Sequence, residues 1–521
     1  MKDETFGVIV IMKIIPQPKN FTYGKKAGLK NQYTVNTDSS SEVKNIIELL
    51  DFSPEFIFSK NATDISIMRD KSLAENEYLL NCSRDCIDIS YNDRAGLFYA
   101  LVSLSQLMYG SFLQTARISD RLDYKYRGIM LDTARHYIPI EKIKAIIRSM
   151  AFYKLNFLHL HLTDDQGWRV EIKAYPSLAE RGSIRGGTQI KRSGQCDTEE
   201  YGAGLYYTQK ELSELVAYAA EYHINVIPEI DIPGHLLGAI SVIPELSCEG
   251  KTVKVRKEWG VEDTIACVGK NKIYEFVENI ISELSLVFPC EYFHIGGDEV
   301  PKIKWKTCAD CQAKMKRLGL KDEDALQGYF YIEVNKILQK YGKKPMIWDE
   351  KLGTDLPENT LLQLWRSELK DNQCADYIEK GGQIVVSYGP YFYFDYDYSQ
   401  TPLKKTYSYT NADIKFGDEL EKGIFGIEGT VWTEWIRDKE KLDFNLYPRM
   451  QALSEKCWNK NAGDYHDFES RLKEHFLYLN EHDIEYCPLN ICNQKFITRL
   501  KILLEKRKNN DGYAEVRAAK K

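Results

Sequence analysis

Two adjacent carboxylic acids, Asp298 and Glu299, follow two glycines in the segment HIGGDE and have the chemistry of an acid and a base. Gly296 and Gly297 allow a tight backbone and close approach of a substrate. Successive side chains of an extended chain point to opposite sides, so this pair is badly placed to flank one glycosidic bond, which requires a separation of about 5 Å in retaining enzymes. Either a distant carboxylate is the nucleophile, or the substrate supplies one, as an N-acetyl group at C2 would by attacking C1.

Carboxylates, tryptophans and tyrosines also follow the other apolar runs of the chain. Those that we single out are Asp132, Arg135, Asp164, Trp168, Glu229, Asp231, His235, Trp348, Asp349, Glu350, Trp365, Arg366, Tyr391, Tyr393, Asp395, Trp432 and Glu434. Carboxylates bind hydroxyls and transfer protons, while indole and phenol rings pack on the apolar face of a sugar. Tryptophans after four different runs favour a sugar-binding site over the polar surface that any strand end has.

The elements that must position these residues are eight short apolar runs, several of them separated by helical patterns. The runs are 128–132, 157–163, 225–231, 292–296, 345–348, 361–365, 383–387 and 424–430, and the helical patterns are 141–153, 209–222, 271–287 and 325–341. Short continuous apolar strands that alternate with helices are typical of an all-parallel sheet. Closed on itself, this sheet is a (β/α)8 TIM barrel, whose active site lies at the carboxyl ends of the strands. The segments 181–206 and 388–420 are expected to be long loops.

We predict three regions. Residues 1–122 form a small α/β supporting domain, with strand-like runs at 56–58, 65–68 and 86–90 and a helix that begins near Asp93. Residues 123–490 form the catalytic barrel, and residues 491–521 form a basic, solvated tail.

Composition excludes several classes of protein. The net charge of −6 argues against nucleic-acid binding. The sequence contains no run of 18 apolar residues, so we predict no membrane span. The first residues do not have the features of a signal peptide. The sequence does not decide whether Met1 or Met12 is the native start. We therefore expect a cytoplasmic protein whose twelve scattered cysteines are mostly reduced.

Two short motifs invite a metal interpretation. His159 and His161 face the same way on a strand, but the fifth to eighth runs supply no further histidine ligand, so we favour packing or a supporting role. Cys308-x-x-Cys311 has no second pair at zinc spacing, and we expect it to lie in a surface loop. We thus expect no metal and no organic cofactor.

At the level of whole segments, the sequence resembles the glycoside hydrolase family 20 β-N-acetylhexosaminidases. The matching segments, in the family's order, are RGIMLDTARHY (127–137), KLNFLHLHLTDDQGWR (154–169), INVIPEIDIPGH (224–235), FHIGGDEV (293–300), MIWDE (346–350), LQLW (362–365), YFYFD (391–395) and GTVWTEW (429–435). The resemblance covers roughly residues 12 to 490, and it is weak in the N-terminal region.

The resemblance implies a role for each matching residue. Glu299 would be the general acid and then the base, Asp298 would orient the acetamido group, and Tyr393 would donate a hydrogen bond to its carbonyl oxygen. The remaining implied roles are walls of the sugar site for Trp348, Trp365 and Trp432, hydroxyl binding for Arg135, Asp395 and Glu434, and a dyad behind Glu299 for Asp164 and His235.

The implied activity is the exo-acting, retaining hydrolysis of terminal β-linked GlcNAc or GalNAc from oligosaccharides or glycoconjugates, through an oxazolinium intermediate. Release of a disaccharide, as by lacto-N-biosidases, and a catalytically silent carbohydrate-binding barrel are the alternatives. We expect neither a nucleic-acid nor a membrane partner, and a homodimer is an option. The Tyr-rich segment 391–411 is expected either to shape the aglycone site or to pack as a surface loop.

Overall fold

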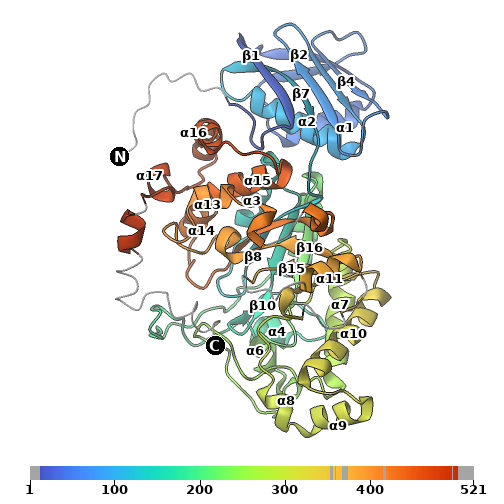
Figure 1. Cartoon of the computed structure of the whole chain (residues 1–521), viewed down its shortest axis with the longest axis vertical. Helices are drawn as coiled ribbons and strands as arrows, with labels where there is room; N and C mark the ends of the chain where they lie inside the picture. Colours follow the sequence, from blue (N-terminus) through green and yellow to red (C-terminus); the bar gives the residue numbers. More distant parts are fainter. Residues whose placement is uncertain are drawn as a thin grey trace.

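The computed structural model describes residues 12–351, 356–357, 359–366, 373–414, 418–495 and 497–502. The first 120 residues contain a seven-stranded sheet, which lies above the rest of the molecule in Figure 1. In spatial order its strands are β1 (Asn20–Gly28), β7 (Phe112–Asp120), β5 (Tyr78–Cys82), β6 (Ile87–Tyr91), β4 (Ile65–Arg69), β2 (Gln32–Thr37) and β3 (Glu55–Phe58). The three predicted strand runs are confirmed as β3, β4 and β6.

Two helices, α1 (Ser40–Leu49) and α2 (Arg94–Leu107), pack on this sheet. Helix α2 begins as predicted, because the Asp93 side chain accepts a hydrogen bond from the Gly96 amide and caps the first turn. It is buried on nearly all sides because it lies between the sheet and the barrel, where Gln106 donates to the Phe152 carbonyl of the barrel's first helix.

The predicted parallel barrel is confirmed, and it is closed. Its strands are β8 (Tyr126–Asp132), β9 (Phe157–His161), β12 (Asn225–Glu229), β13 (Tyr292–His294), β14 (Lys344–Trp348), β15 (Leu361–Leu364), β16 (Gln383–Val386) and β17 (Ile424–Val431). Parallel pairing between β17 and β8, with Gly426 opposite Tyr126, closes the ring. Every side chain of β8 is buried, as expected for a strand enclosed by the barrel core on one side and helices on the other.

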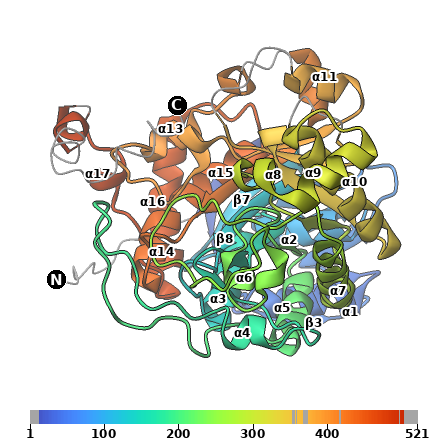
Figure 2. The same ribbon diagram turned by 90° about the horizontal axis from the view of Figure 1, so that it is seen from below.

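The predicted helices α3 (Ile140–Phe152), α5 (Gln209–Glu221), α7 (Lys272–Val287) and α10 (Glu323–Lys340) are confirmed and pack in this order around the barrel (Figure 2). The other described elements are β10 (Thr163–Asp164), β11 (Gly167–Trp168), α4 (Ser177–Glu180), α6 (Leu237–Ile240), η1 (Pro244–Leu246), α8 (Ile303–Thr307), α9 (Ala309–Leu318), η2 (Asp349–Lys351), α11 (Gln373–Glu379), α14 (Lys439–Leu446), α15 (Arg449–Trp458), α16 (Tyr465–Glu481) and α17 (Leu489–Cys492).

The segment 388–420 lies in the long connection between β16 and β17, as expected, and it carries short helices. It contains α12 (Gly389–Phe392), α13 (Leu403–Tyr407), η3 (Asn411–Ile414) and the start of η4 (Asp418–Gly423). Tyr398, Tyr407 and Tyr409 are buried in it, so packing accounts for much of its tyrosine content.

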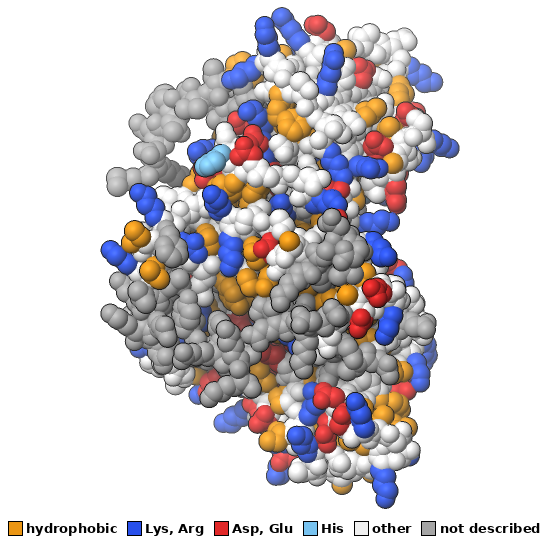
Figure 3. All heavy atoms as spheres, in the orientation of Figure 1, with side chains coloured by type: hydrophobic (Ala, Val, Ile, Leu, Met, Phe, Trp, Pro, Cys, Tyr) orange, Lys and Arg blue, Asp and Glu red, His pale blue; other side chains and the backbone are white. Residues whose placement is uncertain are grey.

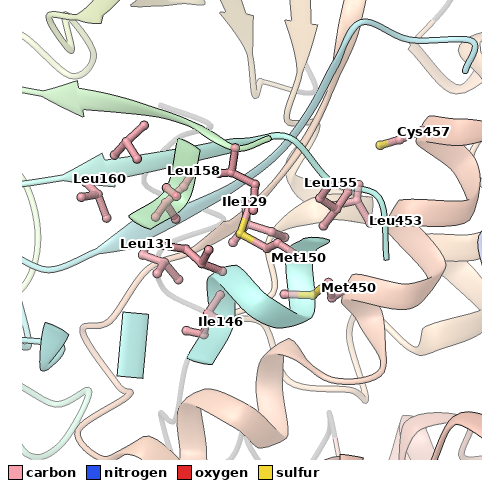
Figure 4. Packing of buried hydrophobic residues seen from close by; sticks show 14 of the residues in the cluster. Ile129, Leu131, Ile146, Met150, Leu155, Leu158, Leu160, Met450, Leu453 and Cys457 are labelled. Carbon is pink, nitrogen blue, oxygen red and sulfur yellow. The ribbon is translucent and has the colours of Figure 1, made fainter. Parts of the chain in front are cut away.

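The core outside the barrel strands is built by apolar faces of the helices. Ile146 and Met150 of α3 lie against Ile129 and Leu131 of β8, and Met450 of α15 completes the layer (Figure 4). All of these side chains are buried, and each full burial of this kind contributes about 1.5 to 3 kcal/mol before entropy is subtracted.

A buried charged cluster joins the N-terminal sheet to the barrel. Lys154 Nζ lies 3.5 Å from Asp120 Oδ2 and donates to Tyr78 Oη at 2.9 Å. Trp458 Nε1 donates to Asp120 Oδ2 at 3.0 Å, and Lys154 and Asp120 are both fully buried. Burial lowers the pKa of Lys154 to about 8, against the opposing effect of Asp120.

The first described residues run back along the last long helix. The Lys13 amide donates to Glu474 Oε2 at 2.8 Å, and Arg471 Nη1 donates to the Ile14 carbonyl at 3.0 Å. The two contacts join residues that are 461 and 457 positions apart.

Cys308 and Cys311 are buried at the start of α9, so the expected surface loop is wrong. The reason is that α8 and α9 pack on the loop that follows η1, which covers both thiols. All twelve cysteines are free thiols in the structure.

Lys and Arg side chains are interspersed with Asp and Glu over the described part of the face in Figure 3, in keeping with the small net charge. Within the described residues, no helix has both the length and the apolar content needed to cross a bilayer. Most of the predicted basic tail, residues 503–521, lies outside the described residues.

Candidate active site

The turn after β13 brings Asp298 and Glu299 to the carboxyl end of the barrel. The Gly297 amide donates to Asp231 Oδ1 at 3.1 Å, which fixes the turn to the end of β12. Gly296 has a φ of 65°, and a Cβ atom there would collide with the Asp231 carboxylate. Only glycine satisfies both requirements, which explains the first of the two glycines.

The two carboxylates do not point to opposite sides, so that expectation is wrong. Glu299 has a φ of 45°, which is the left-handed region, and the alternation of an extended chain does not apply there. Asp298 Oδ2 lies 3.8 Å and Glu299 Oε2 lies 3.6 Å from the same atom, His235 Nε2. Their environments differ, since the Asp298 side chain is 13% exposed and the Glu299 side chain is 42% exposed.

His235 and Asp164 form the predicted dyad behind this pair. His235 Nδ1 lies 3.2 Å from Asp164 Oδ1, and Arg135 Nη2 lies 2.7 Å from Asp164 Oδ2. Burial opposes ionisation of Asp164, but Arg135 and His235 outweigh it and hold the pKa of Asp164 well below its usual range. Burial likewise opposes a charged His235, but Asp164 outweighs it and raises the pKa of His235 well above the usual value.

A second layer of buried charges lies deeper in the barrel, centred on Glu229. Its carboxylate contacts His161 Nδ1 at 2.6 Å and His294 Nδ1 at 2.9 Å, and it accepts a hydrogen bond from Trp348 Nε1 at 2.9 Å. His159 lies between Glu229 and Glu428, at 3.1 and 3.2 Å. Despite its burial, these two carboxylates raise the pKa of His159 to about 9.

His159 and His161 both contact buried carboxylates, and the supporting role that we expect for this pair stays a prediction. His161 Nε2 lies 3.0 Å from Asp164 Oδ2, which connects the deep layer to the dyad.

Four predicted aromatic residues form a continuous cluster beside the carboxylates. Ring centroids are 5.8 Å apart for Trp348 and Trp432, 6.3 Å for Tyr393 and Trp432, and 6.2 Å for Tyr393 and Trp365. Trp365 Nε1 donates to Glu350 Oε1 at 3.0 Å, which fixes its ring. Burial raises the pKa of Tyr393 well above its usual value, so this phenol stays a hydrogen-bond donor at neutral pH.

The three predicted hydroxyl-binding residues differ in how firmly the protein holds them. Arg135 is nearly buried, stacks 5.1 Å from the Trp432 ring, and contacts Asp132, Asp164 and Gln166. Asp395 and Glu434 are half-buried. Glu434 is close enough to help raise the pKa of Arg135, against the effect of burial.

Acid groups crowd the site, and burial raises the pKa of several of them. Burial and the neighbouring Asp231 carboxylate raise the pKa of Asp298 well above its usual range. Burial raises the pKa of Asp231 to about 7, and it raises that of Asp165 to about 7 as well. A group that acquires positive charge beside these acids would favour their ionised forms.

Sequence reasoning singled out Glu229, Asp231 and Glu350 as carboxylates at strand ends but gave none of them a specific role, and it gave none to His294. The available signal is that charged residues interrupt otherwise apolar barrel strands, where an unpaired charge would be costly. Their partners come from other strands, so the sequence does not identify them.

A closed parallel barrel with carboxylates, a histidine dyad and an aromatic cluster at its carboxyl end has the features of a barrel glycoside hydrolase. The model of "Glycosyl hydrolase family 20, catalytic domain" matches residues 124–461, and that of the family's domain 2 matches residues 11–121. The chain belongs to glycosyl hydrolase family 20.

Relatives and solved structures agree with this assignment. A β-hexosaminidase of Porphyromonas gingivalis is 33% identical over 91% of this chain, which spans 64% of that relative's length. A β-hexosaminidase of Vibrio furnissii is 33% identical, and the match covers 85% of this chain and 76% of that relative's length. The crystal structure of a Vibrio harveyi exo β-N-acetylglucosaminidase with N-acetylglucosamine has a TM-score of 0.81 at 30% identity, covering 92% of this chain and 79% of that one.

Proposed function

We propose that this protein is an exo-acting β-N-acetylhexosaminidase that removes terminal β-linked GlcNAc or GalNAc with retention of configuration. The observation that carries the proposal is the placement of Asp298 and Glu299 against one nitrogen of His235, beside the aromatic cluster. Two carboxylates that meet at one imidazole nitrogen are badly placed to act from opposite faces of a sugar. Of the two remaining nucleophiles, a distant carboxylate and the substrate's own acetamido oxygen, we propose the acetamido oxygen, because the chain belongs to family 20, which uses substrate assistance.

In the first proposed step, the acetamido carbonyl oxygen attacks C1 while Glu299 gives its proton to the leaving glycosidic oxygen. Asp298 accepts a hydrogen bond from the acetamido N–H, and the positive charge that develops there favours its ionised form. Tyr393 donates a hydrogen bond to the attacking carbonyl oxygen, which positions it below C1.

In the second step, Glu299 takes a proton from water, and the water oxygen attacks C1 and opens the oxazolinium ring. Two inversions at C1 give net retention. Asp164 holds the His235 ring in place behind Glu299. In the same proposal, Trp348, Trp365 and Trp432 wall the sugar, while Arg135, Asp395 and Glu434 bind its hydroxyls.

The test is a comparison of aryl β-GlcNAc with aryl β-glucoside, which differ at the acetamido group, for the wild type and Asp298→Asn. We expect cleavage of the acetamido sugar and a large loss of kcat in Asp298→Asn. Asp88→Asn, on the exposed face of β6, is the matched control and should keep the wild-type rate. Equal cleavage of both sugars would show that the enzyme carries its own nucleophile.

The same assay separates the alternatives. Cleavage of an aryl lacto-N-bioside in place of aryl GlcNAc would identify a disaccharide-releasing enzyme. Binding of GlcNAc without turnover of any of these substrates would identify a silent carbohydrate-binding barrel.

The cytoplasmic location and a homodimer also stay proposals. Cell fractionation tests the first, and light scattering coupled to size-exclusion chromatography tests the second.

A further inference from the structure

Four cysteines from two distant parts of the sequence meet at one buried point outside the active site. Cys248 follows η1, Cys267 precedes α7, and Cys308 and Cys311 lie at the start of α9. All four sulfur atoms lie within 4.8 Å of one another. The Sγ–Sγ distances are 3.6 Å for Cys267 with Cys308, 3.6 Å for Cys267 with Cys311, and 4.0 Å for Cys248 with Cys311.

These distances fit the edges of a tetrahedron around one metal ion. Zn–S bonds of about 2.3 Å in a regular tetrahedron give sulfur–sulfur edges of roughly 3.8 Å. A disulfide would require about 2.05 Å. Four thiolates in a tetrahedral array favour zinc over the harder oxygen-binding cations.

The surroundings hold the four thiols firmly in place. The Cys267 amide donates to the Leu246 carbonyl at 2.7 Å, and Trp305 Nε1 donates to the Ala266 carbonyl at 2.9 Å. Gly269 packs so closely on the Cys311 backbone that a Cβ atom would collide with it. Such close packing around the cluster is what a preformed metal site needs.

Positive charge surrounds the cluster as well. Lys270 Nζ donates to the carbonyl of Ser247, the residue before Cys248, at 2.6 Å. Lys304, in the turn before Cys308, pairs with Glu249. Lys314 of α9 lies 4.2 Å from the Tyr274 ring centroid. Because Glu249 already balances Lys304, Lys270 and Lys314 are the cations that offset part of the double negative charge that zinc with four thiolates carries.

We propose that Cys248, Cys267, Cys308 and Cys311 bind one structural Zn²⁺ ion. The site joins the loop after β12, which carries His235, to the segment after β13, which carries Asp298 and Glu299. These two segments also touch nearer the active site, since a Cβ on Gly234 would lie 3.2 Å from the Asp298 carbonyl oxygen. Zinc thus fixes the spacing of the dyad and the carboxylate pair without contacting substrate.

This proposal departs from our expectation of no metal, and it does not rest on the proposed function. Cys308-x-x-Cys311 has its partners more than 40 positions upstream, at Cys267 and Cys248, and those two are not a closely spaced pair. Only the fold brings the second pair to the first.

The test is the metal content of the full chain, purified under reducing conditions without added zinc and measured by plasma mass spectrometry. We expect about one zinc per chain. Cys308→Ser/Cys311→Ser should lose it, whereas the matched control Cys82→Ser/Cys374→Ser, which also alters two buried thiols, should keep it. Loss of zinc should lower the melting temperature of the double variant.

A second measurement uses the wild type, so it does not depend on folding of a variant. Protein produced in cobalt-containing medium should show the intense visible bands of tetrahedral cobalt with four sulfur ligands. Three results would each overturn the proposal. The first is stoichiometric iron in place of zinc, and the second is zinc that is retained by Cys308→Ser/Cys311→Ser. The third is metal-free protein in which these four cysteines do not react in a thiol titration because they have formed disulfides. None of these results changes the expected turnover of aryl β-GlcNAc by the wild type.

Discussion

The barrel mouth and the contact between the N-terminal sheet and the barrel both bury charged residues, but they arrange them differently. At the contact, Lys154, Asp120, Tyr78 and Trp458 satisfy one another in a closed cluster. At the mouth, the chain of contacts from Glu229 through His161, Asp164 and His235 ends at Glu299, whose side chain is 42% exposed.

The difference separates two uses of the same residue types. A closed cluster offsets the cost of burying its own charges and has no group left for a ligand. An open chain uses its buried members to orient one terminal group that reaches solvent, which is what a reacting substrate needs. Substitutions in the two regions should therefore change different measurements.

The largest effect is expected from a substitution of Glu299, the last residue in the open chain of contacts at the barrel mouth. Glu299→Gln keeps the shape of the side chain but removes the proton that, in the proposed mechanism, Glu299 gives to the leaving group. We expect turnover of substrates with poor leaving groups to fall by a factor of roughly 10² to 10⁴. Aryl substrates with good leaving groups should lose less, and stability should change little because the side chain is partly exposed.

Steady-state kinetics on both kinds of substrate checks this, with Glu214→Gln on the exposed face of α5 as the control. An unchanged rate on the poor leaving group would mean that another residue is the acid.

A smaller effect, on stability and not on activity, is expected from a substitution in the closed cluster. Lys154→Met leaves Asp120 buried without its cation, and we expect a loss of about 3 to 5 kcal/mol in the free energy of unfolding. Activity per folded molecule should stay at the wild-type level. Urea unfolding measures the loss, and Lys44→Met, whose partner Glu48 is also exposed, should cost less than about 1 kcal/mol. Equal costs for the two variants would show that the buried pair adds nothing to stability.

The smallest expected effect is the dependence of the stability of the closed cluster on pH. The pKa of Lys154 is lowered to about 8 in the folded protein, so above that pH the unfolded chain binds more protons at this residue than the folded protein does. Stability contributed by this residue should therefore rise with pH, by about 1 kcal/mol between pH 7 and 9.

Other groups also titrate in this range, so the informative quantity is the difference between wild type and Lys154→Met. We expect that difference in unfolding free energy to grow in favour of the wild type. A constant difference would indicate that the ammonium group keeps an ordinary pKa.

The sequence was sufficient to predict the barrel because its strands are enclosed on both sides. A strand such as β8 is buried at every position, and this gives a continuous apolar run that periodicity detects. The N-terminal sheet was predicted only in part, since strands such as β1 have exposed positions and a weaker pattern.

Within the site, residue types at strand ends were predictable, whereas their geometry was not. The left-handed backbone at Glu299 reverses the side-chain direction that an extended strand implies, and no feature of its own residue type signals this. The Glu229 contacts and the four-cysteine cluster depend on partners from separate strands and loops, which sequence spacing does not reveal.

The contact between Lys13 and Glu474 has a consequence for synthesis of the protein. These residues are 461 positions apart, so at about 5 to 20 residues per second the ribosome needs roughly 20 to 90 s to make the second after the first. Strand β8 waits about two thirds as long for β17, because Tyr126 and Gly426, which pair at the barrel seam, are 300 positions apart. During this interval the nascent chain has an open barrel edge and an unattached N-terminal segment, and the barrel can close only after β17 has been made.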